Sequence, residues 1–265
     1  MSKYNKIVFL IIIVLLLVVM IIPSIKKKNE RFKAIDEMIA QIVENEETTM
    51  LYINSSECKE CNFQVSQMSL LISEYNLGYY YIDMDGVSNS KKKDIYKKLG
   101  IKDITIPSIQ IYKEGKLEDE LKGINSVKTI FDFIKENAII NKESELVINY
   151  INFDEYKKII RSSEKTLILI GSFTDEYSNQ AQTILWKLSK EKEITINYFI
   201  LTDLTEKEGA EFEKTLDYYE ENEVKIPDLL LVSNSKVLHS MTGLGSKNEY
   251  IDFLIDNLII EDMEA

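Results

Sequence analysis

The sequence predicts an α/β protein with two tandem domains, each a mixed β-sheet flanked by helices, after an apolar N-terminal segment. Helix-like and strand-like patterns alternate along the chain, which is typical of a layered α/β fold. The same order of elements recurs in the second half, which indicates two copies of one domain. We expect an N-terminal segment at 1–28, a first domain at 29–140 and a second domain at 141–265.

In the first domain, amphipathic stretches predict helices, and short apolar runs bounded by turn residues predict strands. The expected helices cover residues 30–47, 58–75, 90–99 and 126–138, and the expected strands cover residues 49–53, 79–84, 108–113 and 117–121. Glu114–Gly115 is a hairpin turn signal between the last two strands, and Gly100 is expected to end the third helix. The apolar face expected for the second helix consists of Phe63, Val65, Met68, Leu71 and Ile72.

The second domain repeats this plan after a connector at residues 141–149. Its expected helices cover residues 154–162, 176–190, 206–221 and 247–258, and its expected strands cover residues 166–170, 194–201, 228–232 and 237–241. Asn234–Ser235 marks the second hairpin turn. A mixed sheet with helices on both faces is therefore predicted twice.

Residues 7–22 form an unbroken apolar run that lysines flank and Pro23 closes. The run is somewhat shorter than the ~20 residues usual for a spanning helix, and it resembles a signal-peptide core nearly as well. No small-x-small cleavage site comes after it, so we expect an uncleaved signal anchor that crosses the cell membrane once. The positive-inside count favours a cytoplasmic C-terminal portion, whereas N-terminal signal anchors usually export the domain behind them. We expect the two domains to be extracytoplasmic.

The charge of the chain is unevenly distributed. Residues 1–28 hold five lysines and no acidic residue, so 27 basic and 44 acidic residues remain, a net charge of −17 for the rest of the chain. Such a surface repels nucleic acid and lacks the basic stripe that phosphate binding needs, so we expect no nucleic-acid partner. Abundant Ile, Asn and Tyr, with Lys far more frequent than Arg, is typical of an AT-rich bacterial genome.

Cys58-Lys59-Glu60-Cys61 lies where the first strand leads into its helix. A thiol at a helix N-terminus meets unpaired N–H groups and the positive end of the helix dipole, which favour the thiolate. The second thiol, one turn along, can close a disulfide and release a trapped substrate. Zinc would lack two ligands, because the chain has two cysteines and one histidine, so we expect neither a metal nor a cofactor. A purely structural disulfide remains an alternative.

Two of the three prolines occupy matching places in the halves. Thr105-Ile106-Pro107-Ser108 and Lys225-Ile226-Pro227-Asp228 each open a hairpin strand. A bond before proline is the realistic place for a cis peptide. Ordinary strand-edge prolines explain one occurrence better than two equivalent ones.

In these residues the chain resembles the thioredoxin family. The Cys-x-x-Cys pair, the Ile106-Pro107 bond and the Gly115 hairpin stand in that family's order and spacing, over about residues 46–138 and, more weakly, 154–260. The resemblance implies two thioredoxin-like folds, with Cys58 as the attacking thiol and Cys61 as the resolving thiol. It also implies that Pro107 is cis beside them and that the Ile106 backbone pairs with an extended substrate. The first domain is also similar to thioredoxin-like bacteriocin-transport accessory proteins.

The chain departs from the family pattern around the cysteines. Tyr52 stands where thioredoxins usually carry a buried Asp, and Glu57 stands in place of the usual Trp. Lys59 is expected to favour the thiolate of Cys58, whereas Glu57 and Glu60 are expected to disfavour it. Without the buried carboxylate, the resolving thiol lacks its usual proton acceptor.

The second domain lacks the cysteines. Aligning Asn54-Ser55 with Gly171-Ser172 places Asp175 opposite Cys58 and Ser178 opposite Cys61, with Pro227 as the counterpart of Pro107. We therefore expect this half to be redox-inactive, with Asp175 as a helix N-cap rather than half of a hydrolytic carboxylate pair with Glu176. His239 is expected on an exposed edge strand and Trp186 in the core.

These observations predict a membrane-anchored thiol–disulfide oxidoreductase that acts on cysteine-containing proteins or peptides through Cys58–Cys61. Its partners would be the substrate, a redox donor or acceptor protein and, through residues 7–22, the lipid bilayer. The direction of electron flow depends on the reduction potential and on the partner. The alternative is a membrane-tethered binding scaffold or accessory factor, for example in bacteriocin export or maturation, in which the Cys pair is structural.

Overall fold

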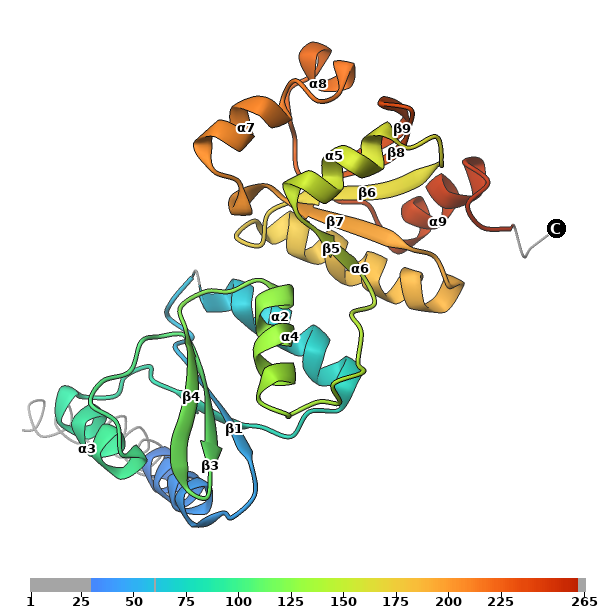
Figure 1. Cartoon of the computed structure of the whole chain (residues 1–265). Coiled ribbons are helices and arrows are strands. Elements are labelled where there is room, and N and C mark those ends of the chain that lie inside the picture. The colour runs from blue at the N-terminus through green and yellow to red at the C-terminus, as the bar shows by residue number, and fades with distance from the viewer. Residues whose placement is uncertain (1–29, 60, 262–265) are drawn as a thin grey trace, which may run out of the picture. The chain divides into compact units, whose positions relative to one another are not determined.

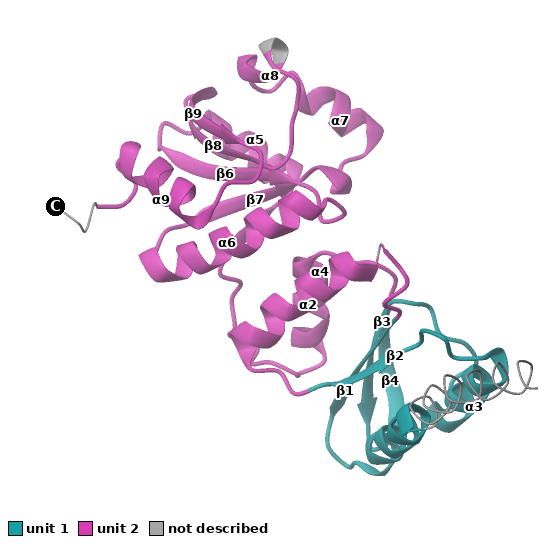
Figure 2. Cartoon of the chain, turned by 180° about the vertical axis from the view of Figure 1, so that it is seen from behind, with its two compact units in different colours: residues 1–54, 79–120 teal, residues 55–78, 121–265 magenta. Residues whose placement is uncertain are grey.

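The computed structural model describes residues 30–59 and 61–261. It contains two compact units (Figure 2): unit 1 consists of residues 1–54 and 79–120, and unit 2 of residues 55–78 and 121–265. The apolar run at residues 7–22 lies outside the described residues. Within the described ranges, no helix combines the length and apolarity needed to cross a membrane. The domain boundary expected at residue 140 stays a prediction.

Unit 1 contains most of a four-stranded mixed sheet (Figure 1). A helix at residues 30–44 precedes β1 (Thr49–Asn54), β2 (Tyr80–Asp83), α3 (Asn89–Leu99), β3 (Ser108–Lys113) and β4 (Lys116–Lys122). The strand order is β2-β1-β3-β4, in which β2 runs parallel and β3 antiparallel to β1. The predicted strands and helices are present, although the first helix ends at residue 44 instead of 47.

Apolar side chains at helical spacing fasten the helix at residues 30–44 to this sheet. Ile35, Ile39 and Ile42 are buried in one cluster with Leu51 and Ile53 of β1. The three isoleucines are four and three residues apart, so they share one face of the helix. Leu51 and Ile53 are two residues apart, so they share one face of the strand. Helix α3 adds Ile95 and Leu99 to the same cluster. Burial of these side chains holds both helices against the sheet.

Helix α3 and strand β3 of unit 1 end at the turn residues that the sequence predicts. Gly100 caps α3 with φ of 72°, the left-handed conformation that glycine adopts at low cost. At the β3–β4 turn, Glu114 and Gly115 both have positive φ, 51° and 71°. A Cβ on Gly115 would lie 1.9 Å from the Val43 carbonyl oxygen, so no other residue fits there without displacing the backbone.

Unit 2 contains α2 (Cys61–Tyr75), α4 (Val127–Glu136) and a five-stranded mixed sheet with its own helices. The sheet order is β5-β7-β6-β8-β9, built from β5 (Asn149–Ile151), β6 (Thr166–Gly171), β7 (Ile196–Ile200), β8 (Asp228–Ser233) and β9 (Lys236–Thr242). The remaining elements are α5 (Phe153–Arg161), α6 (Glu176–Lys192), the 3₁₀ turn η1 (Leu201–Asp203), α7 (Glu206–Phe212), α8 (Asp217–Glu221) and α9 (Lys247–Asp256). β7 runs parallel to β5 and β6, whereas β8 and β9 are antiparallel to their neighbours.

Helices cover both faces of the five-stranded sheet (Figure 1). Helices α5, α7 and α8 bury an aromatic cluster on one face, where the Tyr156 and Phe199 rings stack with centroids 4.5 Å apart. Helices α6 and α9 pack on the other face. Strand β8 is buried along its whole length, as expected for a strand covered on both sides.

Two elements differ from the sequence prediction. The helix expected at residues 206–221 is two helices, α7 and α8, because Phe212, Leu216 and Tyr219 all turn into the aromatic cluster and the intervening chain bends to allow it. Strand β5 lies at the end of the connector expected at residues 141–149, where the sequence predicts no strand. It forms by parallel pairing with β7, and its three residues are too few to carry a period-2 signal.

Candidate active site

Cys58 and Cys61 form a disulfide at the start of α2. Their Cα atoms are 5.2 Å apart, within the range that a disulfide spans without backbone distortion. Cys58 is partly exposed, whereas Cys61 is completely buried. The two sulfurs are therefore inequivalent, since only Cys58 can be approached by a large partner.

One backbone amide of the first turn of α2 points at the sulfur of Cys58. The Cys58 N–H donates to the Ser55 carbonyl at 3.1 Å, which forms a turn that leads into the helix. The Cys61 N–H lies 3.1 Å from the Cys58 carbonyl oxygen and 3.2 Å from Cys58 Sγ. An N–H of the first helical turn thus points at the more exposed sulfur, which is the arrangement that stabilises a thiolate there when the pair is reduced.

Two described charged residues, Glu57 and Lys59, flank Cys58 in the sequence. Glu57 and Lys59 are both exposed, so solvent screens their effect on the sulfur of Cys58. Glu60 lies outside the described residues. The balance among these three side chains in tuning the thiol stays a prediction.

Tyr52 and the Ile106–Pro107 bond belong to unit 1. Tyr52 is buried, its hydroxyl has no hydrogen-bond partner among the described residues, and burial, with smaller effects from Tyr81 and Tyr79, raises its pKa well above the usual value. The phenol is therefore neutral at physiological pH. The Ile106–Pro107 peptide is cis, as predicted, and Pro107 is buried. Because the cysteines belong to unit 2, a substrate contact shared by the cysteines and Ile106–Pro107 stays a prediction.

The counterparts in the second half have structural roles. Asp175 caps α6 by accepting the Ser178 N–H at 2.7 Å, as predicted. Ser178 is completely buried, and the Ile226–Pro227 peptide is cis. Since neither Asp175 nor Ser178 can form a disulfide, this position has no thiol chemistry.

The two other singled-out residues of the second half also lie where the sequence predicts. His239 is exposed on the edge strand β9, and Trp186 is buried on α6 at 3% exposure. No group of three or more potential metal-ligating His, Cys, Asp or Glu residues occurs in the part of the chain that the structure describes.

The buried face of α2 differs from the predicted apolar face. Val65, expected inside, is 37% exposed, whereas Gln64 and Gln67 are buried. Gln64 accepts the Asn125 N–H at 2.8 Å, and Gln67 Nε2 donates to Asn179 Oδ1 of α6. Apolarity alone could not reveal these residues, because their partners lie 61 and 112 residues away.

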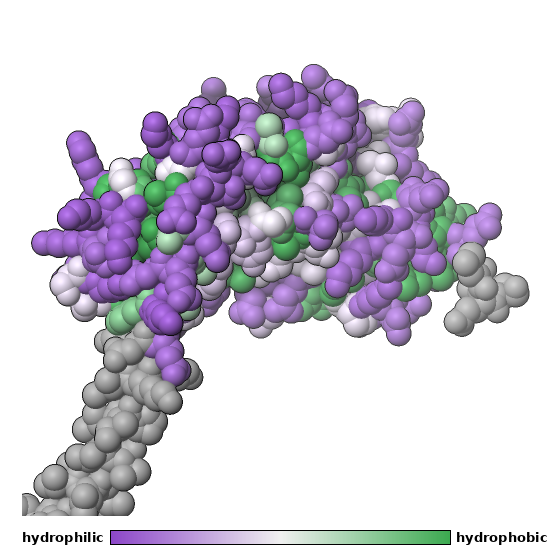
Figure 3. Space-filling model, turned by 90° about the horizontal axis from the view of Figure 1, so that it is seen from below, coloured by the Kyte–Doolittle hydropathy of each residue, from purple (hydrophilic) through white to green (hydrophobic). Residues whose placement is uncertain are grey.

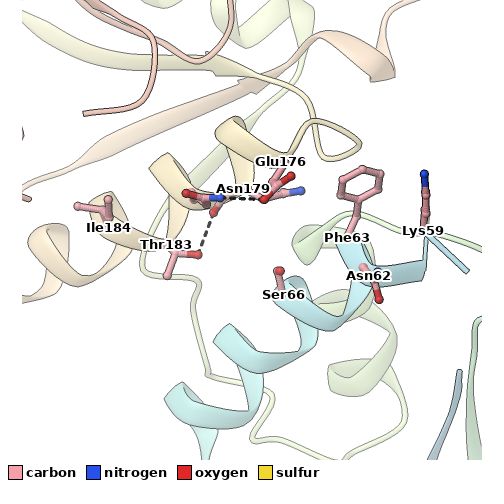
Figure 4. A pocket seen from close by; sticks show the side chains of 9 residues that line it. Lys59, Asn62, Phe63, Ser66, Glu176, Asn179, Thr183 and Ile184 are labelled. Carbon is pink, nitrogen blue, oxygen red and sulfur yellow. Dashed lines mark hydrogen bonds between the residues drawn. The ribbon is translucent and has the colours of Figure 1, made fainter. Parts of the chain in front are cut away.

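A groove of about 640 Å³ lies between α2 and α6 within unit 2 (Figure 4). Lys59, the neighbour of Cys58, and Asn62, the neighbour of Cys61, both line it, so the groove adjoins the disulfide. The described residues that line it are Lys59, Asn62, Phe63, Ser66, Glu176, Asn179, Gln180, Thr183 and Ile184. The groove could not be predicted from the sequence, because its two walls are helices that lie far apart along the chain.

Comparisons with known proteins find partial structural similarity. No protein-family model matches the chain, and no curated protein matches it in sequence. Among solved structures, oxidised thioredoxin O2 from Arabidopsis thaliana is 17% identical, with 40% of this chain and 87% of that chain covered and a TM-score of 0.33. Oxidised thioredoxin from Plasmodium falciparum is 20% identical, with 39% and 91% covered and a TM-score of 0.31.

A third similar structure comes from work on thiol resolution in the yeast mitochondrial 1-Cys peroxiredoxin. It is 16% identical, with 43% of this chain and 99% of that chain covered and a TM-score of 0.32. All three similarities extend over about two fifths of this chain.

Proposed function

We propose that this protein is a thiol–disulfide oxidoreductase that acts on cysteine-containing proteins or peptides through Cys58–Cys61. The observation that carries the proposal is the asymmetry of the pair. Cys58 is partly exposed and receives a helix N-terminal N–H, whereas Cys61 is buried. An accessible, amide-stabilised sulfur suits attack on a partner, and a protected second sulfur suits intramolecular resolution.

The exchange conserves atoms and electrons in either direction. In reduction, the Cys58 thiolate attacks a substrate disulfide, forms a mixed disulfide and expels one substrate thiolate. The Cys61 thiolate then attacks Cys58 Sγ, which closes the Cys58–Cys61 bond and releases the second substrate thiolate. Two electrons pass to the substrate, and the two released thiolates take up protons. A dithiol substrate that attacks the oxidised pair runs the same steps backwards, and a redox partner protein restores the starting form.

The finer features of the proposal come from the sequence. Residues 7–22 would anchor the chain in the cell membrane, with two thioredoxin-like domains outside the cytoplasm and only the first redox-active. A narrower version makes the protein an accessory factor for disulfide-containing peptides, such as exported bacteriocins. Its support is the resemblance of residues 46–138 to thioredoxin-like bacteriocin-transport accessory proteins.

Trapping of mixed disulfides tests the proposal. In a Cys61→Ser variant, Cys58 can attack a substrate but the adduct cannot be resolved, so we expect reductant-sensitive, higher-mass adducts in cells. The matched control is Cys58→Ser, in which the remaining thiol is buried and should trap few or none. Equal adduct yields from both variants would contradict the assigned roles, and a lack of adducts from Cys61→Ser would contradict the activity.

A second candidate is a binding scaffold in which the pair is a structural disulfide, a role that the complete burial of Cys61 fits as well as it fits resolution. Equilibration of the full chain with glutathione or dithiothreitol buffers separates the two. A potential between roughly −120 and −270 mV is that of a working exchange couple. A potential below about −300 mV, with slow exchange, would instead identify a structural disulfide.

A further inference from the structure

The groove between α2 and α6 adjoins the more exposed cysteine. Lys59 comes directly after Cys58 in the chain, and Asn62 comes directly after Cys61, and both residues line the groove. A polypeptide that is attacked by Cys58 must place its neighbouring residues next to this sulfur. The groove is a cavity beside the pair in which those neighbouring residues can lie.

The lining of the groove has the chemistry of a peptide site. Phe63 and Ile184 are partly exposed apolar side chains at the groove, one from each helix (Figure 4). The rest is mainly amide and hydroxyl groups: Asn62, Ser66, Asn179, Gln180 and Thr183. The Asn179 amide and Gln180 Nε2 are already hydrogen-bonded within the protein, so the N–H and C=O groups of an extended backbone would meet mainly the Asn62 amide and the Ser66 and Thr183 hydroxyls. Phe63 and Ile184 lie apart along the groove, and each offers a separate contact for an apolar side chain (Figure 4).

The charge of the lining indicates which kind of peptide segment the groove would bind. Residues 29–265 carry a net charge of −17, yet among the described residues the groove lining contains one cation, Lys59, and one anion, Glu176. Glu176 accepts a hydrogen bond from Gln180 Nε2 at 3.1 Å, one turn along the same helix. The lining is therefore neutral as a whole, which favours a neutral, partly apolar segment over a strongly charged one.

The dimensions suit a short stretch of extended chain. The lining residues of α6 run from Glu176 to Ile184, a length of about 12 Å at the rise of an α-helix. An extended peptide advances about 3.3 Å per residue, so roughly four residues fit along this wall. The volume of about 640 Å³ lies within the usual range of binding pockets.

Buried amides hold the two walls together. Asn179 is 4% exposed, and its Oδ1 accepts from Gln67 of α2 while its Nδ2 donates to the Phe173 carbonyl at 2.9 Å. Gln182 Nε2 donates to the Tyr150 hydroxyl at 2.6 Å. A wall fixed in this way is preorganised, which lowers the entropic cost of binding a peptide.

We propose that the α2–α6 groove binds an extended segment of the substrate polypeptide, neutral and with an apolar side chain within about four residues of the cysteine attacked by Cys58. The proposal rests on the thiol–disulfide exchange proposed above and assigns its substrate class. It also gives α6 of the redox-inactive half a role in substrate selection through Ile184, Thr183 and Gln180.

Exchange kinetics with synthetic mixed disulfides test this role. The reduced full-length chain in mild detergent reacts with a peptide of about nine residues whose central cysteine is bonded to chromogenic thionitrobenzoate. Cys58 forms a bond to the peptide sulfur and expels thionitrobenzoate, and Cys61 then releases the peptide thiol. One peptide carries Leu at the second and third positions on both sides of the cysteine, and the other carries Asp there.

We expect the wild type to react about tenfold faster with the Leu peptide, the effect of partly burying one such side chain. The preference should fall at least fivefold in Ile184→Glu, and also in Phe63→Ala, which adds no charge. Tyr177→Ala is the matched control, because Tyr177 is 59% exposed on α6 and does not line the groove. The small neutral disulfide 2,2′-dithiodipyridine should react equally with all four proteins.

The outcomes separate the groove from the activity. Equal wild-type rates for the two peptides, or an unchanged preference in both groove variants, overturn the groove as substrate site while the exchange activity stands. Both proposals are overturned if the wild type reacts with the peptides and with dithiodipyridine no faster than the unfolded chain. Loss of the dithiodipyridine reaction in the groove variants alone also overturns the assignment, since it would show a disturbed Cys58.

Discussion

Asp228 comes directly after the cis Pro227 at the start of β8, and its carboxyl group is buried at 1% exposure. It accepts hydrogen bonds from the Tyr219 hydroxyl at 3.0 Å and the Thr242 hydroxyl at 2.8 Å. Burial raises the pKa of Asp228, and the two hydroxyl bonds only partly offset that effect. The carboxyl group therefore contributes less to stability at neutral pH than at low pH, although its hydrogen bonds join α8, β8 and β9.

The sign of this effect predicts a pH dependence. A carboxyl whose pKa is raised in the folded state stabilises the fold most below its unfolded pKa of 3.8, and that contribution is lost as pH rises through the folded pKa. We expect Asp228→Asn to gain free energy of unfolding relative to wild type as pH rises from below 3.8 to 7. Urea unfolding across this range measures the difference.

The exposed carboxylate of Asp252 on α9 provides the control for that experiment. Asp252→Asn should have nearly the same pH profile as the wild type. Parallel profiles for wild type and Asp228→Asn would show that the buried carboxyl does not titrate differently in the folded and unfolded chain.

At the scale of elements, α2 and α6 contact each other through buried polar side chains, whereas helices usually pack through apolar ones. Gln67 and Gln182 are buried along with Asn179, and their amides bond to one another across the two helices. Such a network orients the helices specifically when its members are satisfied, and it is costly when one is removed. Gln182 Oε1 has no hydrogen-bond partner among the described residues, so the network is not completely satisfied.

Asn179→Ala is the variant that breaks this network. It leaves the Gln67 amide buried without its acceptor, and we expect a loss of about 1–3 kcal/mol in the free energy of unfolding. The neighbouring Gln180→Ala removes an exposed amide from the same helix and should cost less than about 0.5 kcal/mol. Denaturant unfolding of both variants checks this, and equal losses would mean that the buried bonds contribute nothing specific.

At the scale of the whole molecule, the residues after 28 differ in charge from the apolar run before them. The face in Figure 3 is mostly hydrophilic, and hydrophobic side chains form only small patches on it. The long apolar segment of the sequence, at residues 7–22, precedes Lys26, Lys27 and Lys28. The anchor proposed at residues 7–22 would partition into a bilayer, whereas the charged remainder would stay in water.

This contrast predicts how the chain partitions in cells. The full chain should sediment with membranes and resist extraction by high salt or alkali, whereas a chain without residues 1–28 should be released. Protease added to intact cells or spheroplasts should digest the domains if they are extracytoplasmic, with a cytoplasmic protein as the control for lysis. Full protection in intact cells, with digestion after lysis, would reverse the orientation proposed here.

The sequence by itself determined the features that depend on near neighbours. Strand β3, the hairpin turn at Glu114–Gly115 and the Asp175 cap of α6 were predicted, because turn chemistry and capping act within a few residues. The Cys58–Cys61 pair belongs to this class as well, since the bonded cysteines are only three positions apart in the chain. The candidate site could therefore be located from sequence alone.

Only the tertiary structure decided the features whose partners are distant in sequence. β5 exists because β7 pairs with it, and the bend between α7 and α8 exists because Phe212 and Tyr219 enter one cluster. The outward turn of Val65 and the burial of Gln67 result from an acceptor on Asn179, 112 residues further along the chain. A local pattern ranks side chains by apolarity, but the free energy of burying a polar side chain depends on the partner that satisfies it.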